Sequence, residues 1–390
     1  MAIYLDHAAT TPIRPELVAG YVAQLQVLGN PSSVHSSGQV ARRALEDARD
    51  ALAKIVKCHR SEVLFTSGGT ESDNLAIKGV YLQRKGEDPK RTVVISAGTE
   101  HHAGIDPVEW LEANEGAEAV WLPVSRTGAV DLAWLENYLV ENASKVALIS
   151  LMWVNNETGI ITPITEVTAI AAKYGIPVHS DAVAAFGHVP TSFQDSGLAT
   201  MAISGHKIGS PVGVGALIVA RDAKVAVTSH GGGQERGIRS GTLSAPLAFT
   251  LAQAAALAEV EREEVFERLE GFKLQIISAV KSVAEDADFT RGDEPGFAGI
   301  LHFTFPGCSG DSLLFLLDTA GVSVSTGSAC RAGVAQPSHV VMAMGRSENE
   351  ARGSLRISLG YTTTQEDVDA FIQAFPVAYA GAHKAGLPSK

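Results

Sequence analysis

The sequence has little charge and no basic segment. Only 19% of its 390 residues are charged, and 31 Lys and Arg face 43 Asp and Glu, which gives a formal net charge of −12. An acidic chain repels phosphate backbones, so no nucleic-acid partner is expected. No stretch approaches the roughly 20 apolar residues of a membrane helix, and residues 1–7 lack the pattern of a signal peptide. We therefore expect a cytoplasmic globular protein without a membrane segment.

Cysteine is also scarce. The three cysteines, Cys58, Cys308 and Cys330, are far apart and form no CxxC pair. Neither a disulfide framework nor a zinc site is expected from such spacing. A lone cysteine is most often a small buried hydrophobic residue, and we predict that role for Cys58 and Cys308.

The hydrophobic pattern predicts two domains. The chain exceeds the roughly 250–300 residues at which a single core stops growing. Up to residue 220, apolar strands alternate with amphipathic helices, which is typical of a mainly parallel sheet covered on both faces. The expected strands are 63–66, 93–96, 119–122, 146–151, 177–180, 201–204 and 216–220, and the expected helices are 39–56, 106–113, 132–141 and 164–173. From about residue 245, long helical segments, a strand at 300–305 and a segment at 354–359 predict a smaller α+β domain.

One lysine stands where parallel sheets bind ligands. Ser204, His206 and Lys207 follow an apolar strand, and ligands gather beyond the carboxyl ends of such strands. Lys207 taken alone is typical of an ordinary surface residue. The adjacent hydroxyl, imidazole and glycine favour another interpretation, because they can supply donors to a phosphate while the lysine forms a Schiff base with an aldehyde.

Asp181 ends another apolar strand. A carboxylate there is costly unless it is paired, and a carboxylate against a pyridine nitrogen makes a cofactor ring an electron sink. The alternative is a helix N-cap, since the alanine-rich residues 182–185 follow.

Two further segments follow strands. Gly69 and Thr70 lie where a strand turns into a helix, and free backbone N–H groups bind anions there. His101, within Glu100-His101-His102, can stack on an aromatic cofactor and move protons. Paired histidines are also common on plain surfaces, and as metal ligands these two lack a third partner nearby.

The segment 325–333 is rich in small residues, which predicts a mobile loop. It places Cys330 beside Arg331, and a neighbouring cation favours the nucleophilic thiolate. Mobility suits a cysteine that collects a group at one place and delivers it at another.

These motifs, in this order, closely resemble cysteine desulfurases of the NifS/IscS type, within the class V aminotransferase group of pyridoxal phosphate (PLP) enzymes. The resemblance covers almost the whole chain. Its segments are 4–12, 29–33, 69–74, 100–102, 154–157, 204–207, 231–236, 239–242, 328–330 and 355–356. It implies PLP fold type I, of the aspartate-aminotransferase-like kind. The large α/β domain would comprise residues 14–250, and the small domain, carrying the catalytic-cysteine loop, residues 1–13 and 251–390.

The resemblance also implies roles for single residues. The cofactor-binding residues would be Gly69, Thr70, His101, Asn156, Asp181, Ser204, His206, Lys207 and Thr242. Lys207 would anchor the cofactor, Asp181 would pair with its pyridine nitrogen, and His101 would stack on its ring. Thr70, Ser204 and His206 would hold the phosphate, whereas Thr242 would reach the phosphate of the partner subunit. Arg356, with Asn156, would bind the substrate, and no metal is expected.

The implied reaction converts L-cysteine to L-alanine and leaves the sulfur as a persulfide on Cys330, for iron–sulfur cluster or other sulfur-cofactor assembly. Lys207 would move the Cα proton, and His101 would protonate a leaving species. The 26-residue spacing from Cys330 to Arg356 resembles the long-loop subgroup. The expected partners are L-cysteine, a second copy of the chain, with active sites between the two subunits, and a sulfur-acceptor protein, either a scaffold or a carrier, that the residues do not identify.

One position departs from the family pattern. The family usually reads Asp-Ala-x-Gln, with the glutamine hydrogen-bonded to the cofactor O3′. This chain reads Asp181-Ala182-Val183-Ala184, so alanine stands at the fourth position of the motif. Three alternatives stay open at this point: a selenocysteine lyase, a transaminase, and a non-catalytic scaffold with the same fold. A transaminase does not need Cys330, and the missing glutamine is the only support for the scaffold.

Overall fold

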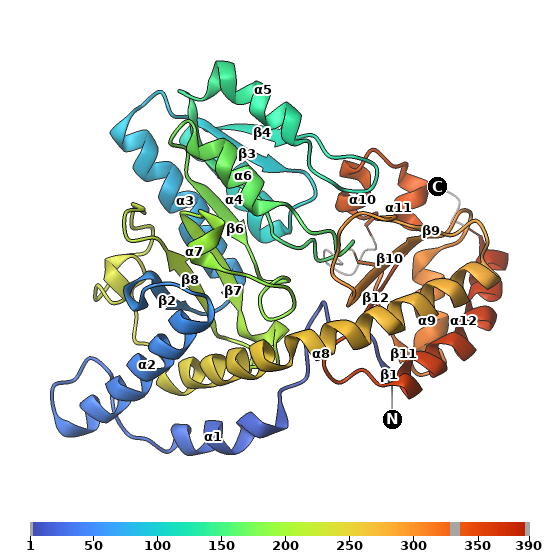
Figure 1. Ribbon diagram of the computed structural model, residues 1–390, viewed down its shortest axis with the longest axis horizontal. Coiled ribbons are helices and arrows are strands. Elements are labelled where there is room, and N and C mark those ends of the chain that lie inside the picture. The colour runs from blue at the N-terminus through green and yellow to red at the C-terminus, as the bar shows by residue number, and fades with distance from the viewer. Residues whose placement is uncertain (1–2, 328–335, 387–390) are drawn as a thin grey trace.

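The structure is a computed structural model that describes residues 3–327 and 336–386 (Figure 1). Its largest sheet has seven strands in the order β2-β8-β7-β6-β5-β3-β4. They are β2 (Val63–Thr66), β3 (Val93–Ala97), β4 (Glu118–Leu122), β5 (Val146–Ser150), β6 (Val178–Asp181), β7 (Thr200–Ser204) and β8 (Gly215–Val219). β8 runs antiparallel to both neighbours, and the other pairs are parallel. The predicted mainly parallel sheet is confirmed.

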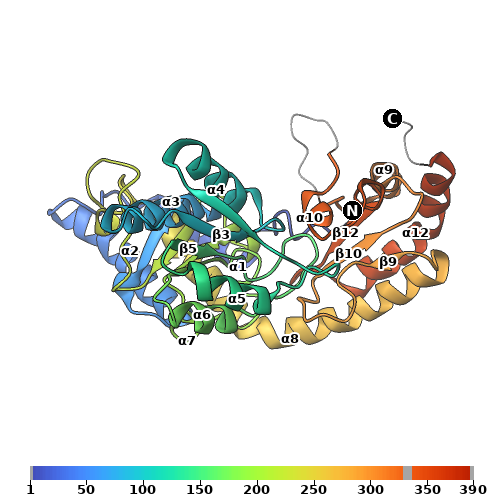
Figure 2. The ribbon, with the colours of Figure 1, turned by 90° about the horizontal axis from the view of Figure 1, so that it is seen from above.

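Helices cover both faces of this sheet (Figure 2). Side chains alternate along a strand, so Val94 of β3 packs in the cluster with α3 and α4, whereas Ile95 belongs to the cluster on the other face with α5 and α6. The helices of this part are α1 (Pro15–Leu25), α2 (Ser36–Ile55), α3 (Gly69–Glu87), α4 (His102–Glu115), α5 (Leu132–Asn142), α6 (Ile164–Ala172) and the short α7 (Phe193–Ser196). Both faces of the sheet are therefore buried, as its near-continuous apolar strands require.

The C-terminal part contains a second, antiparallel sheet of the order β12-β10-β9. The N-terminal strand β1 (Ile3–Tyr4) pairs in parallel with β11 (Val322–Ser323) in this part. Its other elements are β9 (Asp288–Phe289), β10 (Ile300–Thr304), β12 (Ser354–Ser358), α9 (Gly310–Thr319), α10 (His339–Ala343), α11 (Glu348–Arg352) and α12 (Gln365–Ala385). The strand predicted at 300–305 is present as β10, and the segment 354–359 contains β12.

One long helix, α8 (Ala245–Val283), runs from the large sheet to the C-terminal part (Figure 1). Residue 250 lies inside this helix, so the chain passes between the two parts without a loop there. The division into domains of residues 14–250 and residues 1–13 with 251–390 stays a prediction. Within the described ranges, no helix is both long enough and apolar enough to cross a bilayer.

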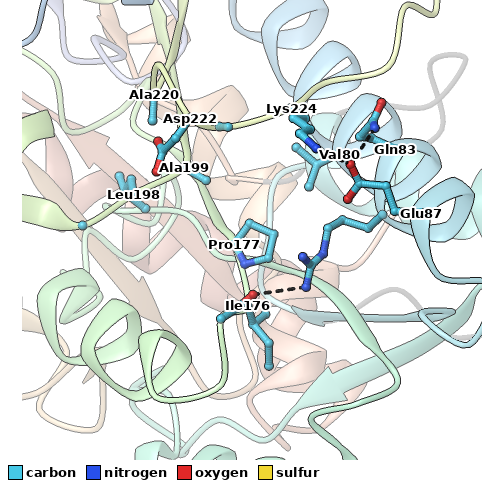
Figure 3. Close-up of a pocket in the computed structure, with 14 residues that line it drawn as sticks. Val80, Gln83, Glu87, Ile176, Pro177, Leu198, Ala199, Ala220, Asp222 and Lys224 are labelled. Atoms are coloured by element: carbon cyan, nitrogen blue, oxygen red, sulfur yellow. Dashed lines mark hydrogen bonds and ion pairs between the residues drawn. The ribbon is translucent and has the colours of Figure 1, made fainter.

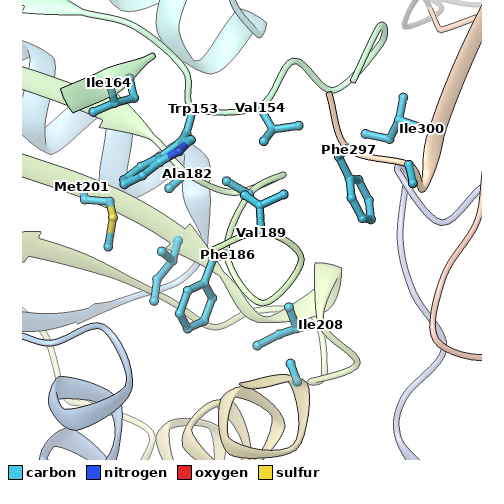
Figure 4. Close-up of a cluster of buried hydrophobic side chains, with 14 of the residues drawn as sticks. Trp153, Val154, Ile164, Ala182, Phe186, Val189, Met201, Ile208, Phe297 and Ile300 are labelled. Atoms are coloured by element: carbon cyan, nitrogen blue, oxygen red, sulfur yellow. The ribbon is translucent and has the colours of Figure 1, made fainter. Parts of the chain in front are cut away.

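A continuous hydrophobic cluster joins the two parts. Figure 4 shows members of this cluster from both parts: Met201 and Phe186 belong to the large sheet and its loops, and Phe297 and Ile300 belong to the C-terminal part. The loops at the carboxyl ends of the strands are thus held between two packed regions, which fixes the side chains they carry.

Candidate active site

A cavity of about 390 Å³ opens beside the carboxyl ends of β6 and β7. The residues predicted for the site that line it are Gly69, Thr70, His101, Asn156, Asp181, Ser204, His206, Lys207 and Arg356. Thr242 is exposed and is not among the lining residues. Cys330 lies outside the described residues, which leave out 328–335, and so does most of the loop predicted at 325–333. The structure thus brings together side chains from both sheets, and their individual roles stay predictions.

Lys207 sits at the end of a single 3₁₀ turn, Gly205–Lys207, that directly follows β7. Its Nζ donates to the backbone carbonyl oxygens of Ala8 and Ala9. Burial lowers the pKa of Lys207 to about 8, and the nearby Arg356 guanidinium acts in the same direction. Roughly a tenth of the amine is therefore uncharged at pH 7, far more than for an ordinary lysine, and the uncharged form is the one that attacks an aldehyde. The two carbonyl partners come from the N-terminal segment and were not predicted.

Asp181 is the last residue of β6 and is buried. Its Oδ1 accepts a hydrogen bond from the backbone N–H of Val183 at 2.8 Å. A turn follows, not a helix, so the N-cap alternative is wrong. Burial raises the pKa of Asp181, whereas His101, the Val183 N–H and Lys207 act in the opposite direction. A protonated ring nitrogen in the cavity would be a further favourable partner.

The amino end of α3 opens onto the same cavity. A side chain at Gly69 would place its Cβ 2.5 Å from Val183 Cγ2, so close packing requires glycine there. The N-cap residue is Gly68, which has no side chain to cap the helix. Backbone N–H groups of the first turn are therefore available for an anion. Ser204, the last residue of β7, lines the cavity on this side.

The two imidazoles in the cavity are held in the neutral form. Burial lowers the pKa of His206 to about 4, helped by Lys207, and burial also lowers the pKa of His101. His101 caps α4, and its Nδ1 accepts from the Ala103 N–H at 3.0 Å. The neutral ring of His101 must then carry its proton on Nε2, where the proton can be donated.

Arg356, on β12, closes the opposite side of the cavity. Its Nη1 donates to the Asn156 carbonyl oxygen and its Nη2 to Asp6 Oδ1, both at 2.8 Å. Asn156 Oδ1 is buried without a hydrogen-bond partner among the described residues. Asp6 was missed as a partner of Arg356, although it lies in the segment 4–12 that carries the family resemblance.

These groups fit pyridoxal phosphate. The cavity combines a lysine with a lowered pKa, a buried carboxylate, the N-terminus of a 19-residue helix and an unpartnered amide oxygen. They match the aldehyde, the ring nitrogen, the phosphate and the remaining polar edge of that cofactor. Lys207, Asp181, Thr70 and Ser204 would hold it.

Ala184 lines the large cavity and also a small one of about 20 Å³ behind Lys207. His7 and His188 line the small cavity as well. Its volume matches that of a single water molecule. The space at the position where the family pattern has glutamine is thus small and partly polar.

The two described cysteines have inert surroundings. Cys308 is buried, and Cys58 is partly buried against the main hydrophobic cluster. Burial raises the pKa of Cys58 to about 12 and that of Cys308 to about 11. Their thiolate fractions near neutral pH are therefore very small.

A second hollow, of about 450 Å³, lies at the opposite edge of the sheet (Figure 3). Its lining includes Pro177 and Ala199, which directly precede β6 and β7. Glu87 there accepts hydrogen bonds from Lys224 and Gln83. None of the predicted site residues lines it, and parallel sheets bind ligands at the other edge. Within residues 3–327 and 336–386, no group of three or more His, Cys, Asp and Glu residues could hold a metal ion.

Comparisons with known proteins agree on one family. Residues 3–371 match the aminotransferase class-V family. The chain is 48% identical to an IscS-like cysteine desulfurase of Mycobacterium tuberculosis, with 98% of each chain covered. It is 40% identical to the cysteine desulfurase IscS of Dictyoglomus turgidum, with 94% of this chain and 92% of that protein covered.

Solved structures give the same result for the fold. A NifS-like protein aligns with a TM-score of 0.89 and 31% identity, covering 97% of this chain and 100% of the other. The protein SspA, solved in complex with cysteine, aligns with a TM-score of 0.79 and 30% identity, covering 91% and 98% of the two chains.

Proposed function

This chain belongs to the aminotransferase class-V family, and we propose that it is a cysteine desulfurase that uses pyridoxal phosphate. It converts L-cysteine to L-alanine and supplies sulfur for iron–sulfur cluster or other sulfur-cofactor assembly. The observation that carries the proposal is the convergence of Lys207, Asp181 and Arg356 on one cavity. An amine, a carboxylate and a guanidinium in this arrangement suit an amino-acid substrate and an aldehyde cofactor.

Arg356 binds the carboxylate of L-cysteine. A guanidinium presents parallel N–H donors that match a carboxylate in two hydrogen bonds. Its bonds to Asp6 and to the Asn156 carbonyl fix the plane of the group before substrate arrives. Such preorganisation lowers the cost of orienting the substrate.

Lys207 moves the proton of the substrate Cα. Pyridoxal phosphate, when bound, supplies the electrophilic carbon and the electron sink for this chemistry. A base works best when its pKa lies near the working pH, and burial brings the pKa of Lys207 to about 8. His101 donates its Nε2 proton to a leaving species, and the bond from the Ala103 N–H to its Nδ1 supports this tautomer.

Cys330 accepts the sulfur. Its thiolate attacks the substrate sulfur, the S–S bond forms, and the C–S bond breaks with its electron pair returning to the carbon that becomes the methyl group of alanine. L-Cysteine and one thiol therefore give L-alanine and one persulfide, and no outside oxidant or reductant is needed. The persulfide then passes to an acceptor protein, and the whole cycle takes place in the cytoplasm.

The active chain is a homodimer. Val18, Val22 and Leu25 form an exposed apolar stripe along α1 at helical spacing, and Leu28 and Val34 beyond it are each 88% exposed. Apolar surface of this kind is typical of a protein interface. A second copy of the chain would cover it, and the partner's Thr242 would then complete the phosphate site.

One experiment tests the activity. The purified protein with PLP is incubated with L-cysteine, and alanine and protein persulfide are quantified. We expect stoichiometric amounts of the two products in the first turnover. A transaminase would form alanine without persulfide only when pyruvate is added, and a scaffold would form neither. The same assay with L-selenocysteine compares the two substrates by their turnover.

A further inference from the structure

A second carboxyl group, Asp73 of α3, lines the cavity together with Asp181. Only 1% of its surface is exposed. Its Oδ1 lies 3.1 Å from His179 Nε2, and its Oδ2 is buried without a hydrogen-bond partner among the described residues. Two buried carboxyl groups in one cavity cannot both be ionised without a large cost. Whether Asp73 is protonated therefore affects whether Asp181 is ionised.

His179 joins Asp73 to the sheet. It lies on β6, two residues before Asp181, and its Nδ1 is 2.9 Å from Oγ1 of Thr200 on β7. Burial lowers the pKa of His179 to about 3, so the ring is neutral and carries one proton. If that proton is on Nε2, Oδ1 of Asp73 accepts it, as the oxygen of either a carboxylate or a protonated acid can. If it is on Nδ1, directed at Thr200, then Nε2 must accept a proton from a protonated Asp73.

The groups around the two acids favour different protonation states. Burial and the carboxyl groups of Asp181 and Glu100 raise the pKa of Asp73 well above its usual value. Asp181 instead faces His101, the Val183 N–H and Lys207, all of which favour its ionised form. The shared negative charge is therefore more stable on Asp181, and the proton is more stable on Asp73.

We propose that Asp73 is a protonated, uncharged carboxyl group that donates to His179 Nε2. Asp181 is then the single carboxylate among the described residues that line the cavity. This inference rests on the proposed function only for the role of Asp181 at the cofactor. Asp73 is a positioning residue: it fixes the His179 ring and keeps a second negative charge away from the acid that pairs with the ring nitrogen.

Infrared difference spectroscopy of the apoenzyme tests the protonation directly. A protonated carboxylic acid has a carbonyl stretch that is separate from the bands of a carboxylate. In the difference between the wild type and Asp73→Asn, we expect the carbonyl band of a protonated acid to be lost. Asparagine keeps the size and the donor to His179, so the variant should unfold at a similar temperature. Loss of carboxylate bands alone would overturn the proposal.

Asp181→Asn is the matched control in the PLP-loaded enzyme. The absorption of the bound cofactor is titrated with pH in the wild type and both variants. We expect the Asp73→Asn curve to superimpose on the wild-type curve and the Asp181→Asn curve to shift. A shift of one pH unit or more in Asp73→Asn would mean that Asp73 is charged, and would refute the inference. A chain without desulfurase activity would leave the infrared result unchanged, so failure of the proposed function is distinguishable.

Discussion

The Arg356 guanidinium and the Asp6 carboxylate form an ion pair at 2.8 Å that joins β12 to the N-terminal segment at the cavity. Arg356 is only 5% exposed, and its Nε is buried without a hydrogen-bond partner among the described residues. A fixed guanidinium with a remaining donor is suited to receive a carboxylate. The pair therefore fixes the guanidinium in place, which suits the role proposed for Arg356 in binding the substrate carboxylate.

Replacing Arg356 by lysine keeps the positive charge but removes the planar guanidinium and its parallel N–H donors. A hydrogen bond to a charged group contributes about 1.5–3 kcal/mol, which corresponds to a loss of roughly tenfold to a hundredfold in kcat/KM for L-cysteine. The PLP content should not change. Arg352→Lys, whose partner is Glu348 near the surface, is the control. Unaltered kinetics in Arg356→Lys would assign carboxylate binding elsewhere.

The rate of PLP uptake by the apoenzyme should depend on the protonation of Lys207. Only the uncharged amine attacks the aldehyde, and the pKa of Lys207 is lowered to about 8. We expect the rate to rise about tenfold per pH unit below 8 and to level off above it. Borohydride should then fix the cofactor to the peptide that contains Lys207. An adduct on another lysine, such as the exposed Lys224, would contradict the assignment of Lys207 as the residue that anchors the cofactor.

Cys330→Ser should retain PLP and bind L-cysteine but form no persulfide. Cys58→Ser and Cys308→Ser should be close to the wild type, because burial raises the pKa of these two thiols to about 12 and 11. For the same reason, an alkylating reagent at neutral pH should label Cys330 first, as peptide mapping would reveal. Release of alanine by Cys330→Ser at the wild-type rate would show that the nucleophile is another group.

Ala184→Gln should restore an amide beside the cofactor oxygen and fill the small cavity of about 20 Å³. One hydrogen bond contributes on the order of 1 kcal/mol, so the pH at which the bound cofactor changes colour should shift by less than about one unit. A spectrophotometric titration of both forms measures it. Superimposable curves would mean that position 184 does not influence the cofactor.

The strands of the large sheet could be predicted to within about one residue. The apolar run at 63–66 is β2, and 201–204 differs from β7 only by its first residue. Apolar runs bounded by polar and glycine residues mark buried strands. The antiparallel direction of β8 could not be predicted, because it depends on pairing with β2 and β7 and not on the composition of the strand itself.

The sequence by itself determined which chemical groups the protein carries at the ends of its strands. Lysine, aspartate and a glycine turn at those positions, together with the order of the motifs, predicted the family and the fold. Only the tertiary structure decided their partners. Arg356 meets Asp6 across 350 positions, Lys207 meets Ala8 across 199, and His179 meets Asp73 across 106. These contacts form because parallel strands bring their carboxyl ends to one edge and because β1 pairs with the C-terminal part. Burial at that edge then sets the pKa values of these side chains, and the positions of the residues along the chain do not reveal that burial.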